Sequence, residues 1–193
     1  MEIDWTRSLG DQLGFQWDGV LRPRLDTLTD ESLHWEPVGG MWGIRRRAES
    51  RSPMPHGAGD VVMDFDVDPA SPPPMTTIAW RLGHIALVFG ERAANHFGAG
   101  GVSYGTTDWP LDVVGMLALV DHWHDQWVAG VAALGPDGLV RPCGPAEGPY
   151  ARSPLADLVL HVNREVLHHG AEVALMMDLY ANRSTLTTMR GHR

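Results

Sequence analysis

Five residues that could bind a metal or move a proton crowd into twelve positions, HVNREVLHHGAE at 161–172. Imidazole nitrogens and carboxylate oxygens are common ligands of divalent metal ions, and both groups transfer protons. At about 100° of rotation per residue, all five fall within about 100° of one helix face. They are His161, Glu165, His168, His169 and Glu172. Apolar residues such as Leu, Val and Met extend the same sector, which predicts that the polar cluster lies within the buried stripe of the helix.

A buried cluster of this kind needs internal partners or a bound ion. An unpaired buried charge costs several kcal/mol, so such groups pair, become neutral or coordinate metal. Glu165 and His169 are at i, i+4, a spacing that lets two side chains hold one cation. His161 and Glu165 have the same spacing, so two registers are open. Glu–His pairs can also satisfy one another without a metal.

A third ligand must come from another helix, and His84 in WRLGHIALVFGE is the candidate. Trp80, Leu87 and Val88 share its helix face, which predicts that His84 points inward. An inward histidine can equally be a hydrogen-bonded core residue. Two imidazoles and one carboxylate, with no thiolate, suit Zn²⁺, Ni²⁺, Fe²⁺ or Mn²⁺ and leave positions open for water or substrate.

Helical hydrophobic periodicity predicts four long helices to position these groups. The expected segments are residues 4–28, 76–98, 108–134 and 153–180. Thr76 or Thr77 is the expected N-cap of the second. Asp108-Trp109-Pro110 and Ser153-Pro154 each combine a cap with an early proline, which predicts the starts of the third and fourth helices.

These segments predict an all-α fold, a four-helix bundle with a long first crossover, in a single domain over residues 1–193. The crossover, residues 29–74, is expected to be a partly ordered flap with one short strand pair near VVMDFDV at 61–67. Residues 98–107 are expected to form a flexible glycine loop, and the tail at 185–193 to fray. Parallel and antiparallel helix neighbours are both compatible with this pattern.

Composition excludes several function classes. The 15 basic residues are all arginine, so Schiff-base and P-loop lysine chemistry is excluded, and the net charge of −9 argues against nucleic-acid binding. Cys143 is the single cysteine, which excludes an internal disulfide and a cysteine-rich zinc cage. No secretory signal or membrane-spanning run is visible, so no membrane association and a cytoplasmic location are expected.

Other patterns have less specific interpretations. In DHWHDQW at 121–127, Asp121, His124 and Asp125 could orient a ligand histidine or act as a base, or form a solvated face with tryptophans packed behind it. The arginines at 45–47 could meet an acidic ligand or belong to a solvated loop. Trp42 and Trp80 could line a substrate cavity. The G-x-S-x-G match at 101–105 lacks the strand and helix of a nucleophile elbow.

The segments TTIAWRLGHIALVFGERAANHFG and HVNREVLHHGAEVALMMDLY resemble the DinB-like superfamily, which includes bacillithiol- and mycothiol-dependent S-transferases. The resemblance implies a four-helix bundle with a long first crossover that holds one divalent metal. His84 and His169 match two positions of the family's ligand pattern. Glu165 stands where the family commonly has its middle histidine, which leaves a His/Glu/His set unless His161 or His168 substitutes.

The resemblance also implies a function. A divalent metal, most simply Zn²⁺ or Ni²⁺, would activate a low-molecular-weight thiol such as mycothiol for transfer to an electrophilic small molecule. His161, His168 and Glu172 would then support the ligands or carry protons. A metal-dependent hydrolase and a non-catalytic binding module are the alternatives. A homodimer through an exposed helical face is compatible with such a bundle.

Overall fold

The computed structural model describes residues 3–98 and 100–188, with side chains as far as residue 185. The long helices are α1 (Trp5–Gln16), α4 (Ile78–Phe97), α5 (Val113–Ala132) and α7 (Leu155–Ala181). The short helices are α2 (Arg22–Leu25), α3 (Asp30–Leu33), α6 (Gly135–Leu139) and α8 (Arg183–Thr188). A π-helical turn (Trp17–Leu21), two 3₁₀ turns (Arg47–Glu49 and Pro145–Tyr150) and the strands β1 (Ile44–Arg46) and β2 (Val61–Met63) complete the described elements.

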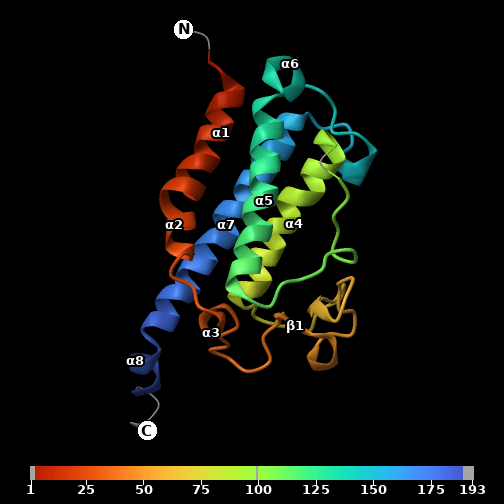
Figure 1. The fold of residues 1–193 in the computed structure, drawn as a ribbon. Helices are drawn as coiled ribbons and strands as arrows, with labels where there is room; N and C mark the ends of the chain where they lie inside the picture. Colours follow the sequence, from red (N-terminus) through yellow and green to blue (C-terminus); the bar gives the residue numbers. More distant parts are fainter. Residues whose placement is uncertain (1–2, 99, 189–193) are drawn as a thin grey trace.

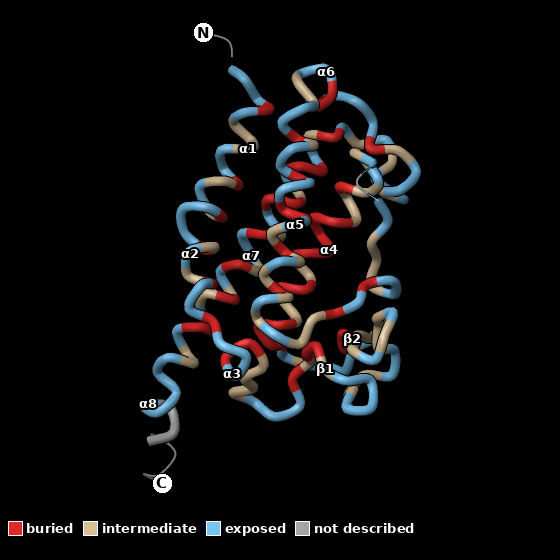
Figure 2. Tube along the Cα trace, in the orientation of Figure 1, coloured by how far each residue is buried: buried red, intermediate tan, exposed pale blue. Residues whose placement is uncertain are grey.

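The four long helices form one bundle, as the sequence predicts (Figure 1). Helices α1 and α7 run in one direction, and α4 and α5 run in the other. The bundle therefore has a parallel pair, α4 and α5, and an antiparallel pair, α4 and α7. Figure 2 shows the buried positions lining the interior of the bundle and the exposed ones facing outward.

The first predicted helix, 4–28, is a continuous helical stretch with a π turn in the middle. Asp4 caps α1 by accepting a hydrogen bond from the backbone of Arg7. The π turn at Trp17–Leu21 leads directly into α2, whose first turn contains Pro23. A proline has no N–H to donate, and helices tolerate it in the first turn. The sequence therefore changes the helix geometry here without ending it.

The other helix boundaries agree with the sequence except for the starts of α5 and α7. Thr77, one of the two predicted caps, accepts from Trp80 N, and Gly98 ends α4 with φ 72°. Helix α5 is capped by Asp112, four residues after the predicted start. Buried Trp109 explains the delay, because its indole donates to a crossover carbonyl and holds the preceding chain extended. Pro154 is itself the N-cap residue of α7, one position after the predicted cap.

A second long connection, residues 98–112, runs the length of the bundle beside α4 (Figure 1). Parallel neighbours require such a return, because the chain leaves α4 at one end of the bundle and must enter α5 at the other. The connection needs to span about 30 Å, the length of a 20-residue helix, and 15 extended residues can do so. The sequence predicts a glycine loop here but not its structural role.

The first crossover packs against the end of the bundle where α4 begins (Figure 1). The predicted strand pair is present, with β1 antiparallel to β2 in the register Ile44↔Met63 and Arg46↔Val61. Ile44, Val62 and Met63 are buried, so the crossover contributes to the core. The tail that is expected to fray is helical as far as Thr188, and residues 189–193 lie outside the described residues. No helix within the described ranges is both long and apolar enough to cross a membrane.

Candidate metal centre

The antiparallel contact of α4 and α7 brings three predicted ligands together. Nε2 of His84 lies 3.7 Å from Oε2 of Glu165, and Nε2 of His169 lies 3.5 Å from the same oxygen. One nitrogen or oxygen from each residue falls within 4.8 Å of the others. Ligand atoms bound tetrahedrally at about 2.0–2.1 Å are separated by about 3.3 Å. The two nitrogen–oxygen distances therefore lie within a few tenths of an ångström of the separation that a small divalent ion needs.

The outer nitrogens of both imidazoles have polar partners. Nδ1 of His169 lies 2.7 Å from a carboxylate oxygen of Glu172, which can only accept, so Nδ1 carries the proton and Nε2 presents its lone pair. Nδ1 of His84 lies 2.6 Å from the hydroxyl of Tyr104, which can accept the same kind of hydrogen bond. Both rings are therefore held with Nε2 toward Glu165, the arrangement that metal-binding histidines need.

Burial keeps both imidazoles neutral. It lowers the pKa of His169 to about 4, with further lowering by His84 and Arg81. Burial also lowers the pKa of His84, although Glu165 opposes the shift. A metal ion binds the neutral form of histidine, so protons do not compete for these nitrogens near neutral pH.

Arg81 extends the network around His169, and sequence reasoning missed it. Its guanidinium forms an ion pair with Glu172, and Nη1 lies 3.3 Å from Nδ1 of His169. Its buried Nε has no acceptor within the described part of the chain. The ion pair holds the carboxylate of Glu172 at the position where it accepts from His169. The sequence did contain a signal for Arg81, because it lies three residues before His84 and positions i and i+3 share a helix face.

The remaining histidines of α7 lie beside the three-residue cluster. Nδ1 of His161 is 3.8 Å from Oε1 of Glu165, and Arg164 donates to that nitrogen across 2.7 Å. Burial lowers the pKa of His161. The side chain of His168 is 64% exposed and contacts Glu172 and the ring of His169, so the prediction that all five groups lie in the buried stripe is wrong for His168. Of the two open registers, the structure brings Glu165 and His169, not His161, toward His84.

Aromatic rings from both long connections cover the α4 side of the cluster. Trp80 stacks on His84 with ring centroids 5.4 Å apart and planes 12° apart. Tyr104 comes from the glycine loop and contacts Phe65 of the crossover, with ring centroids 5.7 Å apart. Trp42 lies farther out against Phe65. Tyr104 was missed because an aromatic residue in a glycine loop belongs to no periodic pattern.

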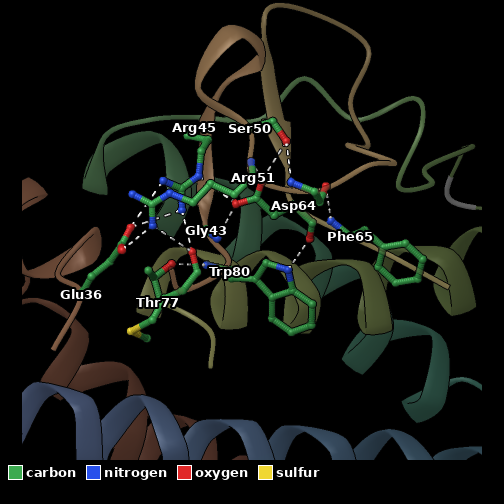
Figure 3. A network of polar contacts seen from close by, with 11 residues as sticks. Glu36, Gly43, Arg45, Ser50, Arg51, Asp64, Phe65, Thr77 and Trp80 are labelled. Atoms are coloured by element: carbon green, nitrogen blue, oxygen red, sulfur yellow. Dashed lines mark hydrogen bonds and ion pairs between the residues drawn. The ribbon is translucent and has the colours of Figure 1, made fainter. Parts of the chain in front are cut away.

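Asp64 organises the crossover next to these rings (Figure 3). Its carboxylate is fully buried and accepts hydrogen bonds from Gly43 N, Arg45 Nε, Ser50 Oγ and Arg51 N. Its backbone carbonyl accepts from the indole of Trp80. The carboxylate therefore fixes the crossover, and the carbonyl fixes the ring that stacks on His84.

The arginines at 45–47 are occupied within the crossover itself. Arg45 pairs with Asp64 and Glu36, and Arg46 pairs with Asp60. Arg47 donates to backbone carbonyls. Their suggested contact with an acidic ligand has no support here, because each guanidinium already has acceptors.

The acidic motif of α5 serves packing rather than the cluster. Asp121 accepts from Arg22 on α2, at 2.8 Å, and His124 stacks on Trp17 at 5.0 Å between ring centroids. Trp123 and Trp127 are buried, as the packing interpretation predicts. These contacts face α1 and α2, so the structure does not bring the motif to the ligand histidines.

Two further sequence candidates have ordinary roles. Burial raises the pKa of Cys143, so its thiol stays protonated near neutral pH and is a poor nucleophile. Ser103 of the G-x-S-x-G match lies in the second connection and hydrogen-bonds Thr106, without the strand–turn–helix setting of a nucleophile elbow.

Fold and site together define a helical bundle with a His/Glu/His group able to hold a metal between two antiparallel helices. A family model described as the DinB superfamily matches residues 12–173, and the chain belongs to that superfamily. The family is generally associated with metals, in agreement with the His/Glu groups of this chain. Neither the curated proteins nor the solved structures contain a significant match.

Proposed function

We propose that the protein is a divalent-metal enzyme that activates a small thiol, such as mycothiol, for transfer to an electrophilic small molecule. The observation that carries the proposal is the convergence of two neutral imidazoles, each with its outer nitrogen engaged, on the carboxylate of Glu165. Zn²⁺ and Ni²⁺ are the ions that this donor set suits best. When bound, such an ion would lower the pKa of a coordinated thiol or water.

The charge of the ligand set fits an anionic reactant. One carboxylate and two neutral imidazoles leave a divalent site with a net charge of +1, which attracts a thiolate. Arg81 and Glu172 keep His169 in the tautomer that exposes Nε2. His161 accepts from Arg164 at Nδ1, so the neutral ring carries its proton on Nε2 and can offer that N–H as a hydrogen-bond donor.

One observation favours a second candidate, a non-catalytic binding module. Glu172 already pairs with both Arg81 and His169 inside the protein, and such networks also stabilise cores without an ion. Hydrolysis by an activated water is a further alternative for the same centre. Small-molecule partners, the absence of nucleic-acid and membrane partners, and a homodimer remain predictions; light scattering coupled to size exclusion tests the dimer.

Metal titration tests the proposal directly. Protein purified without added metal, then incubated with Zn²⁺ or Ni²⁺, is expected to hold one equivalent by calorimetry and elemental analysis. His84→Ala, Glu165→Gln and His169→Ala should each weaken binding by at least tenfold while retaining their helical circular dichroism. Exposed His122→Gln on α5, outside the His/Glu groups of the described residues that could hold a metal, is the matched control. Less than about a tenth of an equivalent in the wild type would defeat the proposal.

Turnover separates the two candidates. The metal-loaded protein is mixed with a panel of thiols and a chromogenic electrophile, and Glu165→Gln provides the background rate. Tight metal binding together with no turnover, and with ligand variants that unfold globally, would favour the structural module.

A further inference from the structure

A second feature adjoins the candidate centre: a cavity of about 780 Å³ between α4, α7 and the segment that precedes α7. Its lining includes Arg92 of α4, Cys143 and Glu147 of the preceding segment, and Asp157, His161 and Arg164 of α7. The volume falls within the range of about 300–1,000 Å³ typical of small-molecule sites. Sequence reasoning did not single out this cavity.

His161 joins the cavity to the candidate centre. The residue lines the cavity, and its Nδ1 lies 3.8 Å from Oε1 of Glu165. One helical turn separates the two positions, a rise of about 6 Å. The three candidate ligands are not among the described residues that line the cavity, so a molecule that fills it ends beside His161, one helical turn from Glu165.

Most charges around the cavity are already paired. Arg92 lies 3.1 Å from Glu91 and 3.9 Å from Glu147. Glu147 also lies 3.0 Å from His96, and both of these side chains are almost fully buried. These ion pairs join Glu147 in the cavity wall to Arg92 and His96 of α4. They leave little net charge for a ligand to recognise.

Arg164 and Asp157 are the exceptions. Arg164 donates a hydrogen bond to the imidazole of His161, and it has no carboxylate partner within the described residues. Asp157 lines the same cavity and forms no ion pair there with any described residue. Seven positions separate the two on α7, which places them on one helix face about 10 Å apart along the axis. The cavity thus offers one positive and one negative group, both exposed and without an oppositely charged partner among the described residues.

We propose that this cavity binds the reactant as an elongated zwitterion, with its carboxylate at Arg164 and its ammonium group at Asp157. A zwitterion is thus the substrate class of the proposed function, and only the role of the metal rests on that function. Binding of the charged groups requires the two side chains alone, so it can be measured on metal-free protein.

Three tripeptide probes of similar length test the charges separately. Triglycine carries both charges about 10 Å apart when extended, N-acetyl-triglycine carries only the carboxylate, and triglycinamide carries only the ammonium group. Saturation-transfer NMR with metal-free protein gives their dissociation constants. Triglycine is expected to bind about fivefold more tightly than either singly charged probe, the effect of one ion pair.

The variants assign each preference to one residue. Arg164→Gln should equalise triglycine and triglycinamide, and Asp157→Asn should equalise triglycine and N-acetyl-triglycine. A purely structural role would weaken all three probes together. The controls are Arg152→Gln and Asp137→Asn, two exposed residues outside the cavity lining that should leave the preferences unchanged.

Equal binding of the three probes, no saturable binding in the millimolar range, or preferences that survive both variants would overturn the inference. Zinc titration of the same variants keeps the two proposals distinguishable. Normal zinc binding without probe discrimination rejects the zwitterion site alone, whereas discrimination without zinc binding rejects the metal centre alone.

Discussion

Replacing Asp64 with asparagine should destabilise the protein far more than the same change at Asp60. Both residues lie in the first crossover and pair with an arginine. Asp64 is fully buried, whereas the Asp60–Arg46 pair is 69% and 61% exposed. The two variants therefore remove the same charge from opposite environments, and Figure 3 shows the buried one around Asp64.

The magnitude follows from the hydrogen bonds. Oδ2 of Asp64 accepts from Gly43 N and Arg45 Nε, and Oδ1 accepts from Ser50 Oγ and Arg51 N. An amide nitrogen in place of either oxygen opposes two donors. At about 1–3 kcal/mol for each buried group left unsatisfied, Asp64→Asn should cost about 3 kcal/mol of unfolding free energy. The exposed pair of Asp60 should contribute about 0–1 kcal/mol.

Urea unfolding followed by circular dichroism measures both losses. The slope of unfolding free energy against urea should be compared across the variants, because a changed slope would mean that the crossover detaches separately. Zinc titration at low urea provides a second readout, since the Asp64 carbonyl holds the indole that stacks on His84. A loss below about 1 kcal/mol for Asp64→Asn, or equal losses for the two variants, would refute this reasoning.

Three further predictions concern packing, the outer hydrogen bonds and pH. Gly83→Ala should cost about 1–3 kcal/mol in urea unfolding, because an added Cβ meets three side chains at 2.6–2.9 Å, whereas Gly10→Ala has no atom within 4 Å and should gain about 0.5–1 kcal/mol. Tyr104→Phe should weaken zinc binding about tenfold by calorimetry without lowering the melting temperature by more than a few degrees; unchanged affinity would contradict a positioning role for the hydroxyl. The pKa of His169 is about 4 in the fold and about 6.5 in the unfolded chain, so below pH 6.5 the unfolded chain binds a proton that the folded protein does not. The unfolding free energy of the metal-free protein should therefore be unaffected by His169 above about pH 6.5 and fall by at most about 3 kcal/mol as the pH drops to 4. A His169→Gln variant should flatten this profile, and an equally steep profile in that variant would assign the effect to other groups.

The helices and two members of the candidate ligand group could be predicted because their signals are local. Glu165 and His169 share a face by helical spacing alone, and Thr77 caps α4 through a contact three residues away. His84 could be proposed as their partner because its apolar neighbours point it inward. That His84 faces Glu165 and His169 rather than the His161 register depends on the alignment of α4 against α7, which no single-helix pattern contains.

The groups that hold the ligands could not be predicted so easily, because they depend on contacts between distant segments. Tyr104 reaches His84 from 20 positions away through a loop without periodicity. Asp64 is buried although aspartate is rarely so, because four hydrogen-bond donors offset the cost of removing its carboxylate from water. His168 shows the limit of the helical wheel. The wheel predicts the direction in which a side chain points, but not whether a neighbouring helix extends far enough to cover it.

The topology of the bundle explains why the surroundings of the centre come from its two long connections. Because α4 and α5 are parallel, residues 98–112 must pass along α4, and this passage delivers the hydroxyl of Tyr104 to His84. The first crossover delivers the carbonyl that orients Trp80, whose ring stacks on the same imidazole. His169 instead takes its partners, Glu172 and Arg81, from the helices themselves. The two ligand histidines are thus held in different ways, so changes in the connections should alter the setting of His84 while leaving that of His169 intact.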